Sequence, residues 1–322
     1  MAERLRERLR SSRSALVAGL LLRRMALLVV LLAVTFLAVE ILPTDAARAT
    51  LDIEASPAEL AARRTQLGLD QPVAVRFLRW MGGLATGDLG VSARGRPVWD
   101  VVGQPLQNTL VLGVLALMLT VLLALALGCV SVLRPGSSLD RVVGSSSTMI
   151  LALPEFVVAN ALVVVFALWL HLLPSVTVAS SSGRPASPAM LVLPVLALTV
   201  RQIGWNTRIV RSALAEQLPA PHVDSAIMDG LPRHRILLHY LLPGAVPTIA
   251  AGVATSVGMV LGGVVAVETI FNFPGMGAVL VDAIRNRDAP LVAAVVALTG
   301  LAITVVLVAS DLVRAWAIGS KS

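Results

Sequence analysis

The sequence predicts an all-α polytopic membrane protein with about six transmembrane helices. Of its 322 residues, 57% are hydrophobic and 14% are charged, whereas soluble domains contain about 25% charged residues. The apolar residues gather in long runs that lack charge, as membrane spans do. Arginines flank these runs and give a formal net charge of +7 without forming one basic patch, so nucleic-acid binding is not predicted.

The predicted spans follow from bilayer thickness. A hydrocarbon core of about 30 Å needs roughly 20 helical residues. Residues 109–133 contain no Asp, Glu, Lys or Arg and form the clearest span. Within the predicted spans, Glu155, His171 and Arg201 are the candidate polar residues for chemistry. The six predicted spans are residues 25–42, 109–133, 149–173, 189–210, 242–267 and 289–310.

The placement of arginine predicts the orientation of the chain. Seven arginines precede the first span and place the N-terminus in the cytoplasm. Alternating spans then place both termini and the most basic loop inside. The predicted organisation is a cytoplasmic segment 1–24, a transmembrane domain 25–312 with an external segment 43–108 and a cytoplasmic loop at about 211–241, and a cytoplasmic tail 313–322.

The external segment carries helix signals. Ser56-Pro57-Ala58-Glu59 is a capping box with proline at the first helical position, and Gly68 suits the end of that helix. A second amphipathic stretch, residues 72–81, is predicted to end at Gly82-Gly83. The segment is therefore expected to form a small cap on the bundle, and the same surface could receive an external partner.

The sequence of the predicted cytoplasmic loop, residues 211–241, indicates a short helix, a sharp stop and a second helix. Asp224 at the helix start complements the helix dipole, Gly230 permits a left-handed exit, and Pro232 prevents continuation. Arg233, His234 and Arg235 then open the next helix at the predicted membrane interface.

Here the chain resembles the permease subunits of binding-protein-dependent ABC importers. Their motif is E-A-A, three residues, G, nine residues, then I-x-L-P. This sequence keeps the spacing, with Asp224 in place of Glu, Ser225 in place of the first Ala and Tyr240 in place of Ile. The resemblance implies a type I ABC importer permease fold in which this helix is the coupling helix that docks on an ATPase subunit. The residues at the motif positions, to which the resemblance assigns the ATPase-coupling role, are Asp224, Ser225, Ala226, Gly230, Leu242 and Pro243.

Further segments, in order from about residue 25 to 312, are similar to the oligopeptide, dipeptide and nickel branch of this family. They include residues 34–45, 67–72, 87–90 and 268–292. The loop 271–288 is expected to be a short hairpin at the outer mouth of the pathway, with a plain connector as the alternative. Its candidate residues for an external gate or a binding-protein contact are Phe271, Phe273, Pro274, Gly275 and Gly277.

The resemblance implies a transport subunit and not an enzyme. No G-x-x-x-x-G-K-[ST] occurs, so ATP and Mg²⁺ are expected on separate subunits and no cofactor on this chain. The implied partners are a second homologous permease subunit, two ATPase subunits, an external solute-binding protein and the lipid bilayer of a bacterial inner membrane. Peptide import is expected, with nickel or metal-chelate import as the alternative. From other classes, an intramembrane enzyme or a membrane scaffold remains open.

Three features inside the spans complete the expectations. An isolated charge within the membrane is costly, so Glu155 and Arg201 are each expected to have a partner. Either the two pair with each other, or Glu155 meets a cationic part of the solute and Arg201 pairs with the other permease subunit. Gly258 and Gly262 form a GxxxG pair that suits close helix approach. Cys129 stands alone and is interpreted as an inert small hydrophobe.

Overall fold

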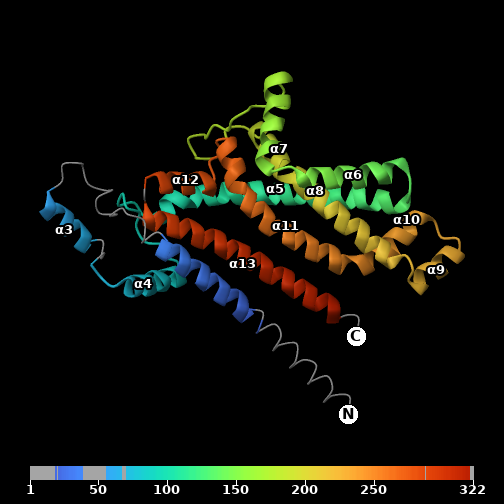
Figure 1. The fold of residues 1–322 in the computed structure, drawn as a ribbon, viewed down its shortest axis with the longest axis horizontal. Helices are drawn as coiled ribbons and strands as arrows, with labels where there is room; N and C mark the ends of the chain where they lie inside the picture. The colour runs from blue at the N-terminus through green and yellow to red at the C-terminus, as the bar shows by residue number, and fades with distance from the viewer. Residues whose placement is uncertain (1–18, 20, 39–55, 67–69, 287, 320–322) are drawn as a thin grey trace, which may run out of the picture.

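The chain folds almost entirely into helices (Figure 1). The structure, a computed structural model, describes residues 19, 21–38, 56–66, 70–286 and 288–319. Within these ranges no strand forms, and isolated antiparallel bridges occur only between Val91 and Pro97 and between Ala179 and Pro185. The prediction of an all-α fold is therefore confirmed.

Five helices of the described chain are long and apolar enough to cross a membrane, and a bent helix pair adds a possible sixth. The 36 residues of α5 extend about 54 Å, more than the roughly 30 Å of a hydrocarbon core, so α5 must tilt or protrude. The five are the N-terminal span Leu21–Ala38, α5 (Val98–Leu133), α8 (Ala189–Gln217), a continuous helix made of α10 (Arg233–Ile236), η2 (Leu237–Leu241) and α11 (Leu242–Ile270), and α13 (Ala289–Gly319).

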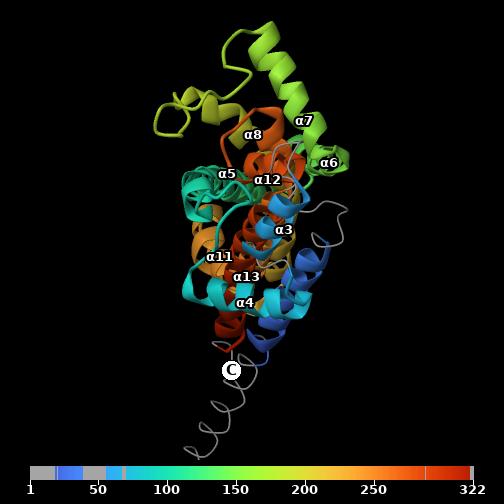
Figure 2. The same cartoon turned by 90° about the vertical axis from the view of Figure 1, so that its left-hand side faces the viewer.

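The predicted span 149–173 is not one straight helix. α6 (Ser138–Ala152) ends before Pro154, where the chain bends by 105°. α7 (Glu155–Leu162) begins after this bend and continues into the π-helix η1 (Val163–Trp169). Proline disfavours helical backbone at the preceding residue, and Leu153 is extended. As a result the α7–η1 pair projects from the bundle in both views, with α7 packed on α8 and α11 at its base (Figures 1 and 2).

Helix α8 lies at the centre of the bundle, packed against α5, α6, α7 and α11. Glycines make these contacts close. A Cβ added to Gly128 of α5 would lie 2.5 Å from Val210, and one added to Gly252 of α11 would lie 2.7 Å from Ile209. By contrast, a Cβ on Gly258 or Gly262 would meet nothing within 4 Å. The GxxxG pair therefore makes no close contact with another helix of the described residues.

Two short helices precede α5 at the end of the bundle opposite α9 (Pro221–Met228), the short helix of the predicted cytoplasmic loop. α3 (Pro57–Gln66) starts with the predicted capping box. The Ser56 backbone N–H donates to Glu59 Oε2 at 2.8 Å, and the Glu59 N–H donates to Ser56 Oγ at 3.3 Å. The Ser56 hydroxyl also donates to Glu59 Oε2 at 2.9 Å, and the two bonds that this carboxylate accepts from Ser56 lower its pKa. Gly68 lies outside the described residues.

The second of these helices is longer than predicted. α4 (Val73–Thr86) runs through Gly82 and Gly83 and ends at Gly87, whose φ of 82° closes the helix. Two glycines lower helix propensity without forbidding a helix, whereas a left-handed residue must stop one. The last helix at this end, α12 (Met276–Arg285), lies against α5, α11 and α13.

Candidate functional site

The short helix α9 ends as its sequence predicts. Gly230 has a φ of 71°. The Leu231 N–H reaches the Ala226 carbonyl at 3.2 Å, and the Gly230 N–H reaches the Ile227 carbonyl at 3.0 Å. This is a Schellman arrangement, and it turns the chain sharply toward α10.

The two faces of α9 differ. Val223 is 0% exposed and Ala226 2%, and both face the bundle, whereas Ile227 and Met228 are 53% and 87% exposed. Asp224 and Ser225 are exposed as well. The small side chain of Ala226 therefore allows α9 to approach its own bundle. Ser225 is the small residue left on the outer face, where it can admit a partner surface.

Apolar packing and two hydrogen-bonded contacts hold this end of the bundle. Arg233 donates to the Leu133 carbonyl at the end of α5 at 3.1 Å. Arg211 of α8 forms a two-point ion pair with Asp140 of α6. The cluster that packs α9 to the bundle includes Val210, Leu214, Val223, Ala226, Leu237 and Leu241. α9 is thereby fixed to the spans that it connects.

Leu242 and Pro243 stand at the start of α11. Leu242 is partly buried against the same cluster, and Pro243 is exposed near the first turn. Proline is favoured there because the first-turn N–H groups lack helical partners. The next residue, Gly244, leaves room for Gln217 of α8, whose Oε1 would lie 2.3 Å from an added Cβ. These residues thus set the path from α9 into the bundle.

Glu155 and Arg201 lie near each other without direct contact. Glu155 is 9% exposed, and its Oε1 atom has no hydrogen-bond partner. Its carboxylate lies over Gly263 of α11, where an added Cβ would be 1.9 Å from Oε2. Arg201 acts on this carboxylate through space, but no ion pair or hydrogen bond joins the two described side chains. The direct pair expected from the sequence is therefore not formed in this structure.

The loop 271–288, here called the gate segment, forms a tight turn followed by α12. Phe271 is 1% exposed and Phe273 0%, and both join the central apolar cluster. Gly275 and Gly277 are buried, and Pro274 is partly buried. In this conformation the two phenylalanine side chains offer no surface to a binding protein.

The structure adds functional candidates to which no motif assigned a role. α11 runs to Ile270, beyond the predicted boundary at residue 267, so Glu268 lies inside a spanning helix. It is 0% exposed and accepts a hydrogen bond from Thr109 at 2.6 Å. Asn108 of α5 donates to the Pro274 carbonyl at 2.7 Å. A carboxylate directly after the end of a predicted span is the signal that could have identified this site, because extending that span by one turn places the carboxylate inside the membrane.

No group of three or more His, Cys, Asp or Glu side chains among the described residues lies close enough together to hold a metal ion. Cys129 is a free, partly buried cysteine.

The chain is similar to known membrane components of transport systems. Residues 103–318 match the family model "Binding-protein-dependent transport system inner membrane component", and residues 17–126 match the model of its N-terminal part. A probable D,D-dipeptide transport system permease protein of Escherichia coli (strain K12) is 33% identical, over 88% of this chain and 90% of that protein. A probable peptide ABC transporter permease protein of Sinorhizobium fredii is 32% identical, over 82% of this chain and 85% of that protein.

Among solved structures, an inward-facing form of the MetNI methionine ABC transporter matches with a TM-score of 0.57. It is 18% identical over 68% of this chain and 97% of that chain, and this likeness concerns the fold alone. The family match covers most of the chain and includes α9 and the gate segment. The chain therefore belongs to the family of inner-membrane components of binding-protein-dependent transport systems, and it is a multi-pass membrane protein of the ABC importer permease class.

Proposed function

We propose that this chain is one of two channel-forming permease subunits of an ATP-driven importer that carries peptides. In this family ATP hydrolysis resides in separate subunits, and an ATPase and a solute-binding protein are its partners. Relatives named as peptide and dipeptide permeases support peptides as the solute class. None of these relatives is named for nickel or metal-chelate transport, so that alternative gains no support. The family match likewise gives none to an intramembrane enzyme or a scaffold.

The exposed face of α9 is the observation that carries the coupling role. Ile227 and Met228 are large apolar side chains exposed on a short polar loop, and Asp224 and Ser225 lie on the same outer surface. Exposed apolar side chains rimmed by polar residues mark protein–protein contacts. The partner that fits α9 is the ATPase subunit, which would receive this helix in a groove on its surface.

The orientation that follows places α9 in the cytoplasm. The Arg-rich N-terminus precedes the first span, and cytoplasmic loops carry the excess of Lys and Arg. An ion pair of 3.1 Å between Arg24 and Asp311 ties the start of the N-terminal span to α13 near its C-terminal end. Both termini then lie inside, and α3, α4 and the gate segment face outside.

The transport cycle would move α9 together with the bundle. Two ATPase subunits close on ATP and push the coupling helices, and the permeases switch between inward-facing and outward-facing packings. The second permease subunit would cover surfaces that this chain leaves open. These are the glycine face of α11 around Gly258 and Gly262, and the arm α7–η1, which exposes Phe156, Leu168 and Trp169. The solute would cross between the two permeases.

The coupling role is tested by replacing an exposed residue of α9. Met228→Asp should release the ATPase subunits from the purified importer and stop uptake, because a charge would have to be buried in their groove. Ile284→Asp, at a 56% exposed site on α12, is the matched control at the opposite end and should retain the ATPase. Full retention of the ATPase and normal uptake by Met228→Asp would contradict the proposal.

The solute class is tested with the binding protein that partners this permease. Its thermal unfolding midpoint should rise with di- to oligopeptides and stay unchanged with nickel or nickel chelates. Uptake into proteoliposomes that contain the assembled importer should show the same selectivity. A response to nickel alone would replace peptides with the metal alternative.

A further inference from the structure

Glu268 is a buried carboxylate, and no cationic side chain among the described residues pairs with it. It lies in the last turn of α11 and is 0% exposed. Its partners are all hydrogen-bond donors: the Thr109 hydroxyl at 2.6 Å, the Gly277 N–H at 2.5 Å, and the Ala278 N–H. The first turn of α12 therefore points its free N–H groups at this carboxylate, as a helix N-terminus favours.

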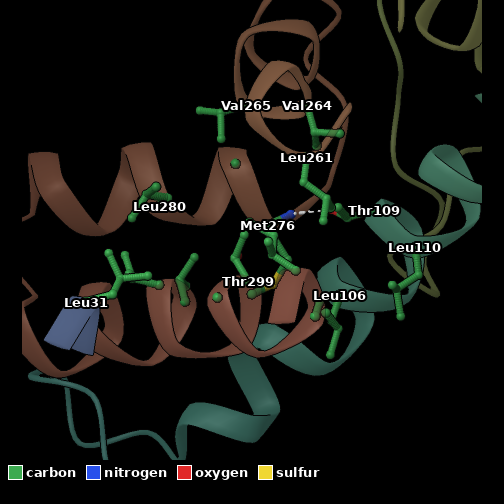
Figure 3. A pocket seen from close by; sticks show the side chains of 16 residues that line it. Leu31, Leu106, Thr109, Leu110, Leu261, Val264, Val265, Met276, Leu280 and Thr299 are labelled. Atoms are coloured by element: carbon green, nitrogen blue, oxygen red, sulfur yellow. Dashed lines mark hydrogen bonds between the residues drawn. The ribbon is translucent and has the colours of Figure 1, made fainter. Parts of the chain in front are cut away.

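Thr109 connects α5 to the same site. Its hydroxyl donates to Glu268 Oε1 and accepts the Met276 N–H at 2.8 Å, the bond drawn as a dashed line in Figure 3. The neighbouring Asn108 donates to the Pro274 carbonyl at 2.7 Å. Two spans and the first turn of α12 are thus joined through one carboxylate and one hydroxyl.

The turn fits this site only with glycine. A Cβ on Gly275 would lie 2.0 Å from Glu268 Oε1, and a Cβ on Gly277 would lie 2.7 Å from the Val265 Cα. The backbone of the gate segment therefore lies directly on the carboxylate. No side chain separates the two.

Apolar packing beneath the same turn is incomplete. A pocket of about 230 Å³ lies between the N-terminal span, α5, α11, α12 and α13, and Met276, Gly277 and Leu280 of α12 line one side of it (Figure 3). The far end of the gate segment is held mainly by polar contacts. Asp288 accepts from the Ala93 N–H at 3.0 Å, and Arg94 donates to Asn286 at 2.7 Å. Hydrogen bonds thus fix the first turn of α12 together with the apolar packing of Met276, which is 4% exposed and belongs to a cluster with Val98 and Val102 of α5.

We propose that Glu268 and Thr109 form the latch that holds the gate segment closed on α5, and that opening of the outer mouth breaks these bonds. This inference rests on the proposed function, since it takes α12 as part of the outer gate. A permanently fixed turn needs only apolar packing, and a buried carboxylate in a span is costly. Hydrogen bonds to a carboxylate can be exchanged for bonds to water when the mouth becomes hydrated, so this contact can open and close.

The test measures how fast α12 lifts from the bundle. Ala283 of α12 is 1% exposed, so Ala283→Cys reacts with a charged maleimide only when the helix moves. The importer is purified with its partner subunits in nanodiscs, with Cys129→Ser as background. Thr109→Val keeps the side-chain shape and removes both hydrogen bonds, whereas Thr109→Ser keeps the hydroxyl. Ala213→Cys, at a 1% exposed site on α8, reports general loosening.

Thr109→Val should raise the labelling rate at Ala283→Cys at least tenfold, and Thr109→Ser should stay within twofold of the parent. Labelling at Ala213→Cys should not change in either variant. Glu268→Gln loses one acceptor oxygen and should also raise the labelling rate at Ala283→Cys. If Thr109→Val assembles poorly, Glu268→Gln is used in its place. ATP should speed labelling in the parent.

Equal rates for the valine and serine variants, or an equal rise at both cysteines, would overturn the latch. The labelling needs no solute, so it reports on the latch even if the importer carries something other than peptides. If Thr109→Val takes up peptide normally and its labelling at Ala283→Cys is unchanged, the latch is excluded, whereas the proposed function still stands.

Discussion

Asp140 and Arg211 form a two-point ion pair that ties α6 to α8 close to the coupling end. The Arg211 Nε atom lies 2.7 Å from Asp140 Oδ1, and its Nη2 atom lies 3.0 Å from Oδ2. The Asp140 side chain is 7% exposed, whereas that of Arg211 is 45% exposed. The geometry is that of a strong charge-assisted pair, and solvent around the arginine weakens it.

Arg211→Gln should lower the stability of the bundle, because the Asp140 carboxylate loses its ion-pair partner. The measurement is the thermal unfolding midpoint of the purified importer. Arg208→Gln is the matched control, since Arg208 lies one turn earlier on α8, is exposed and has no ion pair in the described chain. Equal midpoints for the two variants would show that the pair contributes nothing measurable.

Gly230→Val should abolish transport while the protein still inserts into the membrane. The φ of 71° at Gly230 costs a residue with a side chain roughly 1–2 kcal/mol, and a β-branched one more. The substitution therefore shifts the end of α9. Gly136→Val is the matched control, because Gly136 has a φ of 73° and open space around it but lies in the α5–α6 loop. Comparable uptake by both variants would remove the coupling role from Gly230.

Gly263→Ala should harm assembly or transport, because the added methyl group would occupy the space of the Glu155 carboxylate. Adding Glu155→Ala should restore much of the loss, since the smaller side chain frees that space. Assembled importer is measured by size-exclusion chromatography, and transport by peptide uptake. A double variant as defective as Gly263→Ala alone would show that the two residues do not share this contact.

Glu155 and Arg201 make no direct bond in this structure, so a charge swap between them should not restore function. Glu155→Gln and Arg201→Gln should each reduce uptake, and the swapped double variant should be no better than either. A reduction specific to peptides with a free amino terminus would favour contact between Glu155 and the cationic part of the solute. Recovery in the swapped variant would instead establish a pair that forms in another state of the cycle.

Cysteine labelling in intact cells should determine the orientation. A labelling site must be exposed on the outer side. Ser92 of the external segment 43–108 is only 3% exposed and would label poorly. Ser181 lies in an exposed loop before α8 and is the better site. In a Cys129→Ser background, Ser181→Cys should react with an impermeant thiol reagent. Met228→Cys on α9 should react only after lysis and removal of the ATPase subunits that are proposed to cover it. The opposite pattern would invert the topology and the assignment of the outer gate.

The local features of this protein were predictable from neighbouring residues. The charge-free runs predicted the spans, because any segment in hydrocarbon must satisfy its own backbone and expose apolar side chains. The capping box at Ser56 and the stop at Gly230 also formed as predicted, since both depend on bonds between residues a few positions apart. The motif around Gly230 also indicated the family, because it too consists of residues at fixed, short spacings.

Tertiary structure decided the features that depend on distant contacts. Whether Ala226 faces the bundle or a partner depends on how α9 packs, and the spacing of the motif is the same in either case. Glu268 meets Thr109 across 159 positions of sequence, and the carboxylate of Glu155 meets Gly263 only because α6 and α7 bend by 105°. The sequence contained each of these side chains, but their partners are set by the packing of whole helices, which no local pattern specifies.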